Sequence, residues 1–142
     1  SHNYKIFSFR NERKRAAVTV MNKKIDTLLL SQYSEEDIVV VELIYGNLKF
    51  IAISIYLDIT NDITIDIHKI ENIINFAKDR KLLISMVSNA RSKTWHNILT
   101  NARGRIIEEF VLQNSLHIIN EDSEITTFEP NTGSSNRGLN NR

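Results

Sequence analysis

The chain contains no cysteine, and this absence excludes disulfide bonds and thiolate metal sites. It also contains no apolar run that approaches the roughly 20 residues needed for a membrane helix. Residues 1–4 lack the basic, apolar and small segments of a signal peptide. The net charge of +1 is too small to indicate a polyanionic partner by itself. The sequence therefore predicts no membrane partner and leaves the redox compartment open.

Several catalytic and metal-binding patterns are missing as well. The four histidines, His2, His68, His96 and His117, are scattered, and none has the spacing of a zinc site. The sequence has no nucleophile elbow and no glycine-rich phosphate loop. No internal repeat is present. We therefore predict no metal ligands from the motifs alone, and we expect His68 to lie on the surface of a helix.

The residues that are present favour one globular domain. The apolar fraction is 42% and the charged fraction 25%, an ordinary balance for a folded chain of this length. The first sixth of the chain carries a basic stretch of Arg10, Arg13, Lys14, Arg15, Lys23 and Lys24. Such a stretch has two interpretations: it contacts phosphates, or it is a solvated strand edge protected by charge.

Apolar periodicity predicts strands first and then strands that alternate with helices. Residues 48–57 alternate strictly, with Ile51, Ile53 and Ile55 on one face, as in a strand. Residues 38–45 are a nearly continuous apolar run, which is typical of a strand covered on both faces. We expect further extended segments at 4–9, 15–22, 23–30, 82–87 and 116–119 and from 126 on.

Two helices are expected, at residues 64–80 and 102–114. In the first, apolar residues recur at spacings of three and four, and Thr64 or Asp66 is the expected N-cap. In the second, the predicted buried stripe is Ile106, Ile107, Phe110 and Val111. Strands followed by alternating strands and helices indicate a mixed α/β sandwich, with several topologies open.

One segment carries a specific resemblance. The strand at 82–87 is followed by Asn89-Ala90-Arg91-Ser92, then by Trp95-His96, and then by Thr100-Asn101-Ala102-Arg103-Gly104-Arg105. This arrangement resembles the strand–loop–helix core of the endonuclease/exonuclease/phosphatase superfamily, in the form carried by insect non-LTR retrotransposons. Arg15-Ala16-Ala17, Thr126-Thr127-Phe128 and Gly133-Ser134-Ser135-Asn136 resemble further segments of that family.

The resemblance implies a fold and a division of the chain. The implied fold class is α/β, an endonuclease/exonuclease/phosphatase-type β-sandwich flanked by helices and incomplete at both ends. Residues 1–136 would be a partial endonuclease-like domain, and residues 137–142 a disordered or unrelated tail. Strands such as the one at 38–45 would then present unpaired edges, through which we expect marginal stability or self-association.

The resemblance also implies a site. Intact relatives are Mg-dependent endonucleases of the nucleus that nick target DNA, with an Asp-x-Asn pair at the end of the strand. Asn89 matches the phosphate-orienting Asn, and Tyr56 matches the Tyr whose hydroxyl contacts the scissile phosphate. Val87 stands at the catalytic Asp position. Arg137-Gly138-Leu139 replaces the family's Ile-Asp-Leu, so the Asp that orients the His is missing. The metal-binding Glu and the Ser-Asp-His motif are expected outside residues 1–142. We expect a catalytically inactive chain that binds no Mg tightly.

Each site residue also has a plainer interpretation. Asn89 would fasten the loop through local hydrogen bonds, and Tyr56 would simply pack on its strand. The predicted DNA-binding residues are Arg91, Lys93, Trp95 and Arg103. Trp95 would otherwise be a hydrophobic anchor, and Arg91 and Lys93 solvated loop residues. Arg103 would otherwise pair with Glu108 or Glu109.

Three functions are consistent with these residues. The first is a degenerate retrotransposon endonuclease domain, with weak contact to DNA or no partner. The second is an active Mg-dependent endonuclease, in which Glu42 or Asp58 would serve as ligands. The third is a domesticated DNA- or protein-binding module that acts through the basic stretch.

Overall fold

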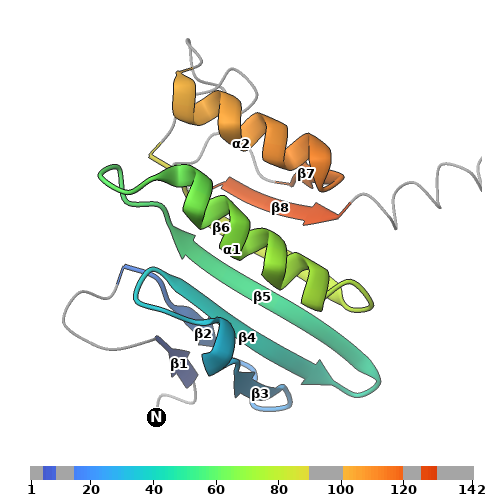
Figure 1. The fold of residues 1–142 in the computed structure, drawn as a ribbon. Coiled ribbons are helices and arrows are strands. Elements are labelled where there is room, and N and C mark those ends of the chain that lie inside the picture. Colours follow the sequence, from blue (N-terminus) through green and yellow to red (C-terminus); the bar gives the residue numbers. More distant parts are fainter. Residues whose placement is uncertain (1–4, 9–14, 90–100, 120–125, 131–142) are drawn as a thin grey trace, which may run out of the picture.

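The computed structural model of the chain describes residues 5–8, 15–89, 101–119 and 126–130. Figure 1 labels its helices and strands, which alternate in the second half of the chain as expected. In chain order they are β1 (Lys5–Phe7), β2 (Val18–Val20), β3 (Asp26–Leu29), the 3-10 turn η1 (Ser31–Tyr33), β4 (Ile38–Tyr45), β5 (Leu48–Tyr56), α1 (Ile63–Phe76), β6 (Lys81–Val87), α2 (Ala102–Gln113), β7 (Leu116–Ile118) and β8 (Thr126–Pro130).

The main sheet has six strands in the order β3-β4-β5-β6-β8-β7. β5 and β6 are parallel and are joined through α1, whereas the other neighbours are antiparallel. β4 and β5 form a hairpin that reverses at Gly46, where a φ of 59° suits a residue without a Cβ. Because β5 and β6 are parallel, their C-terminal ends lie side by side at one end of the sheet, next to the start of α1.

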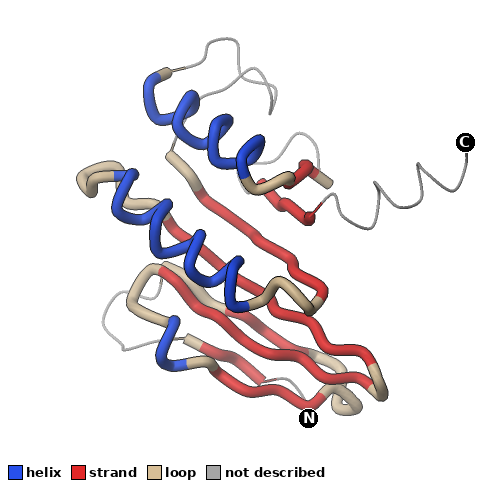
Figure 2. Tube along the Cα trace, turned by 45° about the vertical axis from the view of Figure 1, so that its right-hand side comes forward, coloured by secondary structure: helices blue, strands red, loops and turns tan. Residues whose placement is uncertain are grey.

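Two different layers cover the two faces of this sheet. Figures 1 and 2 show α1 and α2 side by side on one face. In Figure 1 β2 lies behind β4 with β1 beside it, and this two-stranded sheet packs on the face opposite the helices. Its small cluster is built around three buried residues, Ala16, Val39 and Val41. This layer explains why the first half of β4 is buried on both faces, as the continuous apolar run predicted.

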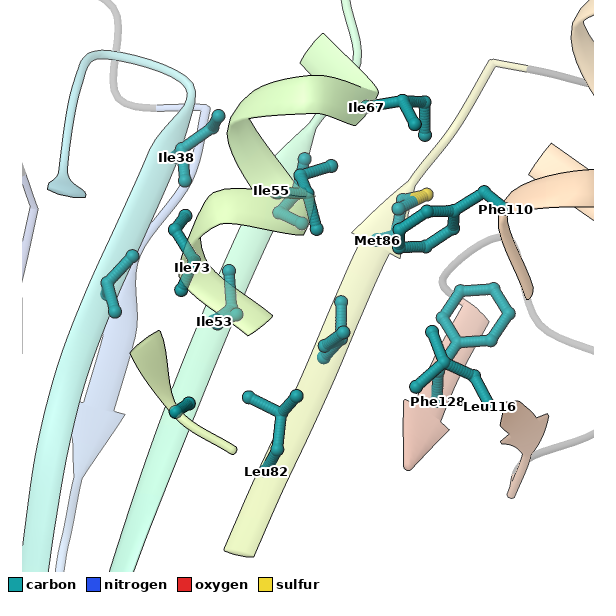
Figure 3. Packing of buried hydrophobic residues seen from close by; sticks show 14 of the residues in the cluster. Ile38, Ile53, Ile55, Ile67, Ile73, Leu82, Met86, Phe110, Leu116 and Phe128 are labelled. Carbon is teal, nitrogen blue, oxygen red and sulfur yellow. The ribbon is translucent and has the colours of Figure 1, made fainter. Parts of the chain in front are cut away.

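The larger core lies between the sheet and the two helices. Figure 3 shows Ile53 and Ile55 of β5 beneath Ile73 of α1. In the same view Phe110 of α2 lies against Met86 of β6. Both helices are therefore held on the sheet by side chains that recur at helical spacing, as the periodicity predicted. Within the described ranges no helix is long and apolar enough to cross a membrane.

The predicted helix ends need correction. The N-cap of α1 is Asp62, whose side chain accepts from the Thr64 N–H at 2.9 Å, and not Thr64 or Asp66. Asp66 is buried in the first turn, and burial raises the pKa of its carboxyl. α1 ends at Phe76 rather than at residue 80. Arg80 instead folds back onto Glu42, with 3.1 Å between Nε and Oε2.

The predicted unpaired edge of the strand at 38–45 is also wrong. β4 is paired with β3 on one side and with β5 on the other. In the part of the chain that the structure describes, the edges of the main sheet are β3 and β7. The expectation failed because the segment at 26–29, interpreted as a mere extended piece, forms a paired strand of its own.

Candidate functional site

Tyr56 and Val87 are the last residues of neighbouring parallel strands and stand opposite each other in the register. The Leu57 N–H donates to the Val87 carbonyl at 2.8 Å and joins the two strand ends. Ile55 and Met86 are buried under the helices, so strand alternation places Tyr56 and Val87 on the opposite face. The two positions that the sequence resemblance assigned to a catalytic Asp and a phosphate-contacting Tyr are thus adjacent, and the first is occupied by the aliphatic Val87.

Asn89 follows β6 in a left-handed conformation with φ of 50°. Asn tolerates this region better than most residues. Its Nδ2 donates to the Leu57 carbonyl at 2.8 Å, so the side chain is bonded to a residue 32 positions earlier, just beyond β5, rather than to a local backbone group. β6 ends at Val87, as predicted, so Asn89 lies beyond the strand. The phosphate contact of Asn89 stays a prediction.

Arg15 connects the other layer of the protein to the same strand ends. Its Nε and Nη2 donate to the two carboxylate oxygens of Asp37 at 2.9 and 2.6 Å, and its Nη1 donates to Asp58 at 2.7 Å. The guanidinium also lies over the Tyr56 ring, 4.6 Å from the ring centroid. All three charged side chains are mostly shielded from solvent, with exposures of 25% for Arg15, 16% for Asp37 and 19% for Asp58.

This network perturbs the ionisation of its members. Hydrogen bonds from the Thr60 N–H and hydroxyl, followed by the bond from Arg15, hold the pKa of Asp58 well below its usual range. The bonds to Asp37 and then Asp58 raise the pKa of Arg15 above its ordinary value. The charged forms of Arg15 and Asp58 are therefore the ones that this arrangement stabilises.

Arg103, in the first turn of α2, donates hydrogen bonds to backbone carbonyls at these strand ends. Its Nη2 donates to the carbonyls of Asp58 and Ser88, both at 3.3 Å, and of Leu57 at 3.5 Å. Its Nη1 donates to the Asn61 carbonyl at 3.3 Å. Its Nε is buried without a hydrogen-bond partner. The side chain thus ties the first turn of α2 to the ends of β5 and β6, and its predicted DNA contact stays a prediction.

Several predicted residues lie outside the described residues. These are Arg91, Lys93 and Trp95 of the loop, Arg10, Arg13 and Lys14 of the basic stretch, the segment 133–136 and the tail at 137–142. Of the basic stretch, the structure describes Lys23 and Lys24 as exposed. Arg15 differs from these two lysines because its guanidinium is paired with Asp37 and Asp58.

The described side chains at these strand ends do not fit a magnesium ion. Val87 has no oxygen in its side chain, and Asp37 and Asp58 are both paired with Arg15. Glu42, the other ligand considered, is paired with Arg80. Among the residues whose placement is described, no three His, Cys, Asp or Glu side chains gather as they would around a metal ion.

Sequence reasoning missed the Arg15–Asp37–Asp58 network. Arg15 looked like one member of a basic stretch, and Asp37 looked like part of a polar turn. The one available signal was position: Asp37 immediately precedes β4, and Asp58 closely follows β5, so the hairpin register brings them together. Nothing in the sequence indicated that an arginine 22 residues before Asp37 would bridge the pair.

Comparison with known proteins gives the family. A family model described as "Endonuclease-reverse transcriptase" matches residues 50–136, which is more than half of the chain. Among solved structures, the chain is similar to the endonuclease domain of TRAS1, a telomere-specific non-LTR retrotransposon. That match has a TM-score of 0.83 and 20% sequence identity, and covers 90% of this chain and 67% of that chain. No curated protein matches.

The two matches support each other at different levels. At 20% identity the likeness to the TRAS1 domain establishes the fold, and it confirms the predicted α/β class with helices beside a sheet. The family model includes β5, β6, Asn89 and the α2 segment, the parts that carried the resemblance in the sequence. The chain belongs to the endonuclease–reverse transcriptase family, with the fold of a non-LTR retrotransposon endonuclease domain.

Proposed function

We propose that this chain binds the DNA backbone at the ends of β5 and β6 without cutting it. The observation that carries the proposal is Val87, an aliphatic side chain next to Tyr56 where the family's strand ends on a carboxylate. The chain would keep the DNA-facing part of an endonuclease domain and lack its chemistry.

Phosphodiester hydrolysis needs a nucleophilic water and a cation that neutralises developing charge. Magnesium prefers carboxylate oxygens as protein ligands. In this chain Val87 offers none, and Arg15 already neutralises Asp37 and Asp58. A magnesium ion would therefore have to displace a guanidinium that donates three hydrogen bonds. This competition supports the absence of cleavage.

The proposed contacts to DNA are Tyr56, Asn89 and the loop that follows, with Arg91, Lys93 and Trp95. Phosphate contacts position a protein on DNA without reading its sequence. Binding that relies on a few cations is weak and falls with salt, because each neutralised phosphate releases condensed counterions. We therefore propose weak binding that depends on ionic strength and little on DNA sequence.

The absence of cleavage is tested with supercoiled plasmid and the purified chain in magnesium. We expect no nicking above the level of a matched sample in EDTA. Val87→Asp is the companion variant, because it restores a carboxylate at the end of β6. Relaxation of the plasmid by the unmodified chain, abolished by EDTA, would refute the proposal and favour an active endonuclease.

DNA binding is tested by fluorescence anisotropy with a labelled duplex over a series of salt concentrations. We expect the logarithm of the binding constant to fall linearly with the logarithm of the salt concentration. The slope should correspond to the neutralisation of a few phosphates. Lys78→Met is a suitable control, because Lys78 is exposed just beyond the opposite end of α1 from the site. Affinity that does not change with salt would contradict phosphate binding.

A further inference from the structure

Arg15 contacts Tyr56 of the proposed site but comes from a different layer of the protein. It belongs to the segment that leads into β2, on the face of the sheet opposite the helices. From there it reaches Asp37 before β4 and Asp58 after β5. The Tyr56 N–H also donates to the Asp37 carbonyl at 2.8 Å, so the same two strand ends are already bound through the backbone.

The contacts of Arg15 need an arginine. A guanidinium is a planar group with donors on a rigid fork, which matches the two oxygens of one carboxylate. Here the fork engages Asp37 with two nitrogens and leaves the third for Asp58. A lysine ammonium is a single point of charge on a flexible stem and cannot reproduce this bridge together with the contact over the Tyr56 ring.

The stack fixes the side chain that the proposed function depends on. A cation over the face of an aromatic ring is attracted by the ring quadrupole, more strongly where water is excluded. The Arg15 guanidinium lies over one face of Tyr56 while both of its carboxylate partners hold it in place. The position of the Tyr56 ring, and with it the direction of its hydroxyl, is therefore linked to the Arg15–Asp37–Asp58 bridge.

We propose that Arg15 is a positioning residue for the phosphate contact of Tyr56. It acts by holding the Tyr56 ring in place where β4 begins and β5 ends, and it does not touch DNA. This inference rests on the proposed function and deepens it, because it names the residue that sets the geometry of that site.

The decisive variant is Asp37→Asn, measured by DNA anisotropy beside Arg15→Met. Arg15→Met removes the stack, and we expect about three- to fivefold weaker binding. Asp37→Asn weakens the two-oxygen grip on Arg15, and we expect about threefold weaker binding although a negative charge is lost. If Arg15 acted only through local charge, Asp37→Asn would bind DNA more tightly, and that result would overturn the proposal.

A double-variant cycle tests whether Arg15 works through Tyr56. Tyr56→Phe removes the hydroxyl that would contact the phosphate. In that background we expect Arg15→Met to cause no further loss of affinity, because the group it positions is gone. Fully additive losses would mean that Arg15 contacts DNA independently and would refute the positioning role. We expect Arg15→Lys to lower the affinity for DNA about as much as Arg15→Met does, rather than to restore binding.

An NMR readout separates this inference from the proposed function. With labelled tyrosine, the ring signals of Tyr56 should shift in Arg15→Met and in Asp37→Asn but stay unchanged in Lys78→Met. Unchanged Tyr56 signals in both site variants would overturn the positioning role even if the chain binds DNA. If the unmodified chain shows no affinity for DNA, the proposed function fails instead, whatever the Tyr56 signals do. Should Arg15→Met fail to fold, Asp37→Asn carries both measurements.

Discussion

Two arginines, Arg15 and Arg103, hold the same three-residue segment from opposite sides. Arg15 binds the carboxylate of Asp58 and stacks on Tyr56, whereas Arg103 binds the carbonyls of Leu57 and Asp58. Strand ends leave backbone groups without sheet partners, and buried groups of this kind need other ones. Arg103 satisfies carbonyls of this kind, whereas Arg15 bonds only to side-chain carboxylates beside them.

The depressed pKa of Asp58 predicts a pH-dependent contribution to stability. Its folded-state pKa lies below the unfolded value of about 3.9, so the unfolded chain binds more protons as the pH falls below that value. The stabilisation is therefore complete above about pH 5 and is lost progressively as the pH falls toward the folded-state pKa. We expect Asp58→Asn to be less stable than the unmodified chain at about pH 7, and the difference to be smaller at about pH 3. Urea unfolding at both pH values checks this, and a difference that is independent of pH would contradict it.

Arg103 predicts a measurable loss of stability on truncation. Its hydrogen bonds to carbonyls are 3.3–3.5 Å long, so each is weak, but Arg103→Met would remove all of them at once. We expect a loss of about 1–2 kcal/mol in the free energy of unfolding, in the range for lost bonds to a charged group. Arg105→Met is the matched control, since Arg105 is exposed on the same helix turn and should change stability by less than about 0.5 kcal/mol. Equal losses of unfolding free energy in the two variants would contradict the structural role of Arg103.

At the scale of elements, the sequence was informative where periodicity was strong. The alternation in β5 and the helical spacing in α1 and α2 each reflect one face packed on one core, and these elements form where they were predicted, apart from the ends of α1. The insertion of β8 between β6 and β7 could not be predicted, because three strands of similar composition fit several orders. The bridge from Arg15 to Asp37 and Asp58 was missed for the same reason: it depends on which surfaces meet and not on a local pattern.

The two faces of β6 give a matched pair of variants. Leu82 is 6% exposed and faces the helices, whereas Leu83 is 40% exposed on the opposite face. We expect Leu82→Ala to cost about 2–5 kcal/mol, through lost burial and a residual cavity. The same change at Leu83 should cost well under half as much, because it leaves no cavity. Denaturant unfolding of both variants checks the assignment, and a similar loss at both sites would show that a second layer also covers β6.

At the scale of the whole molecule, the two faces of the sheet are covered unequally. The helices bury one face along β4, β5, β6 and β8, whereas β1 and β2 cover the other face near β4. Arg15 is a polar link between that small layer and the rest. Self-association through the described sheet edges, β3 and β7, stays a prediction. The unequal cover indicates that stability differs across the fold.

Hydrogen exchange should reveal that difference directly. We expect the amides of Val39–Val41 and of Ile51, Ile53 and Ile55 to exchange slowest, because their strands are paired on both sides and buried. The amides of β2 should exchange faster, since its sheet has two strands of three residues each and rests on a small cluster. Arg15→Met should accelerate β2 further and leave the centre of β5 unchanged, because the bridge joins the small layer only to the strand ends. If the amides of β2 exchanged as slowly as those of β5, the two layers would open as one unit. That result would contradict the expected difference in stability between the layers.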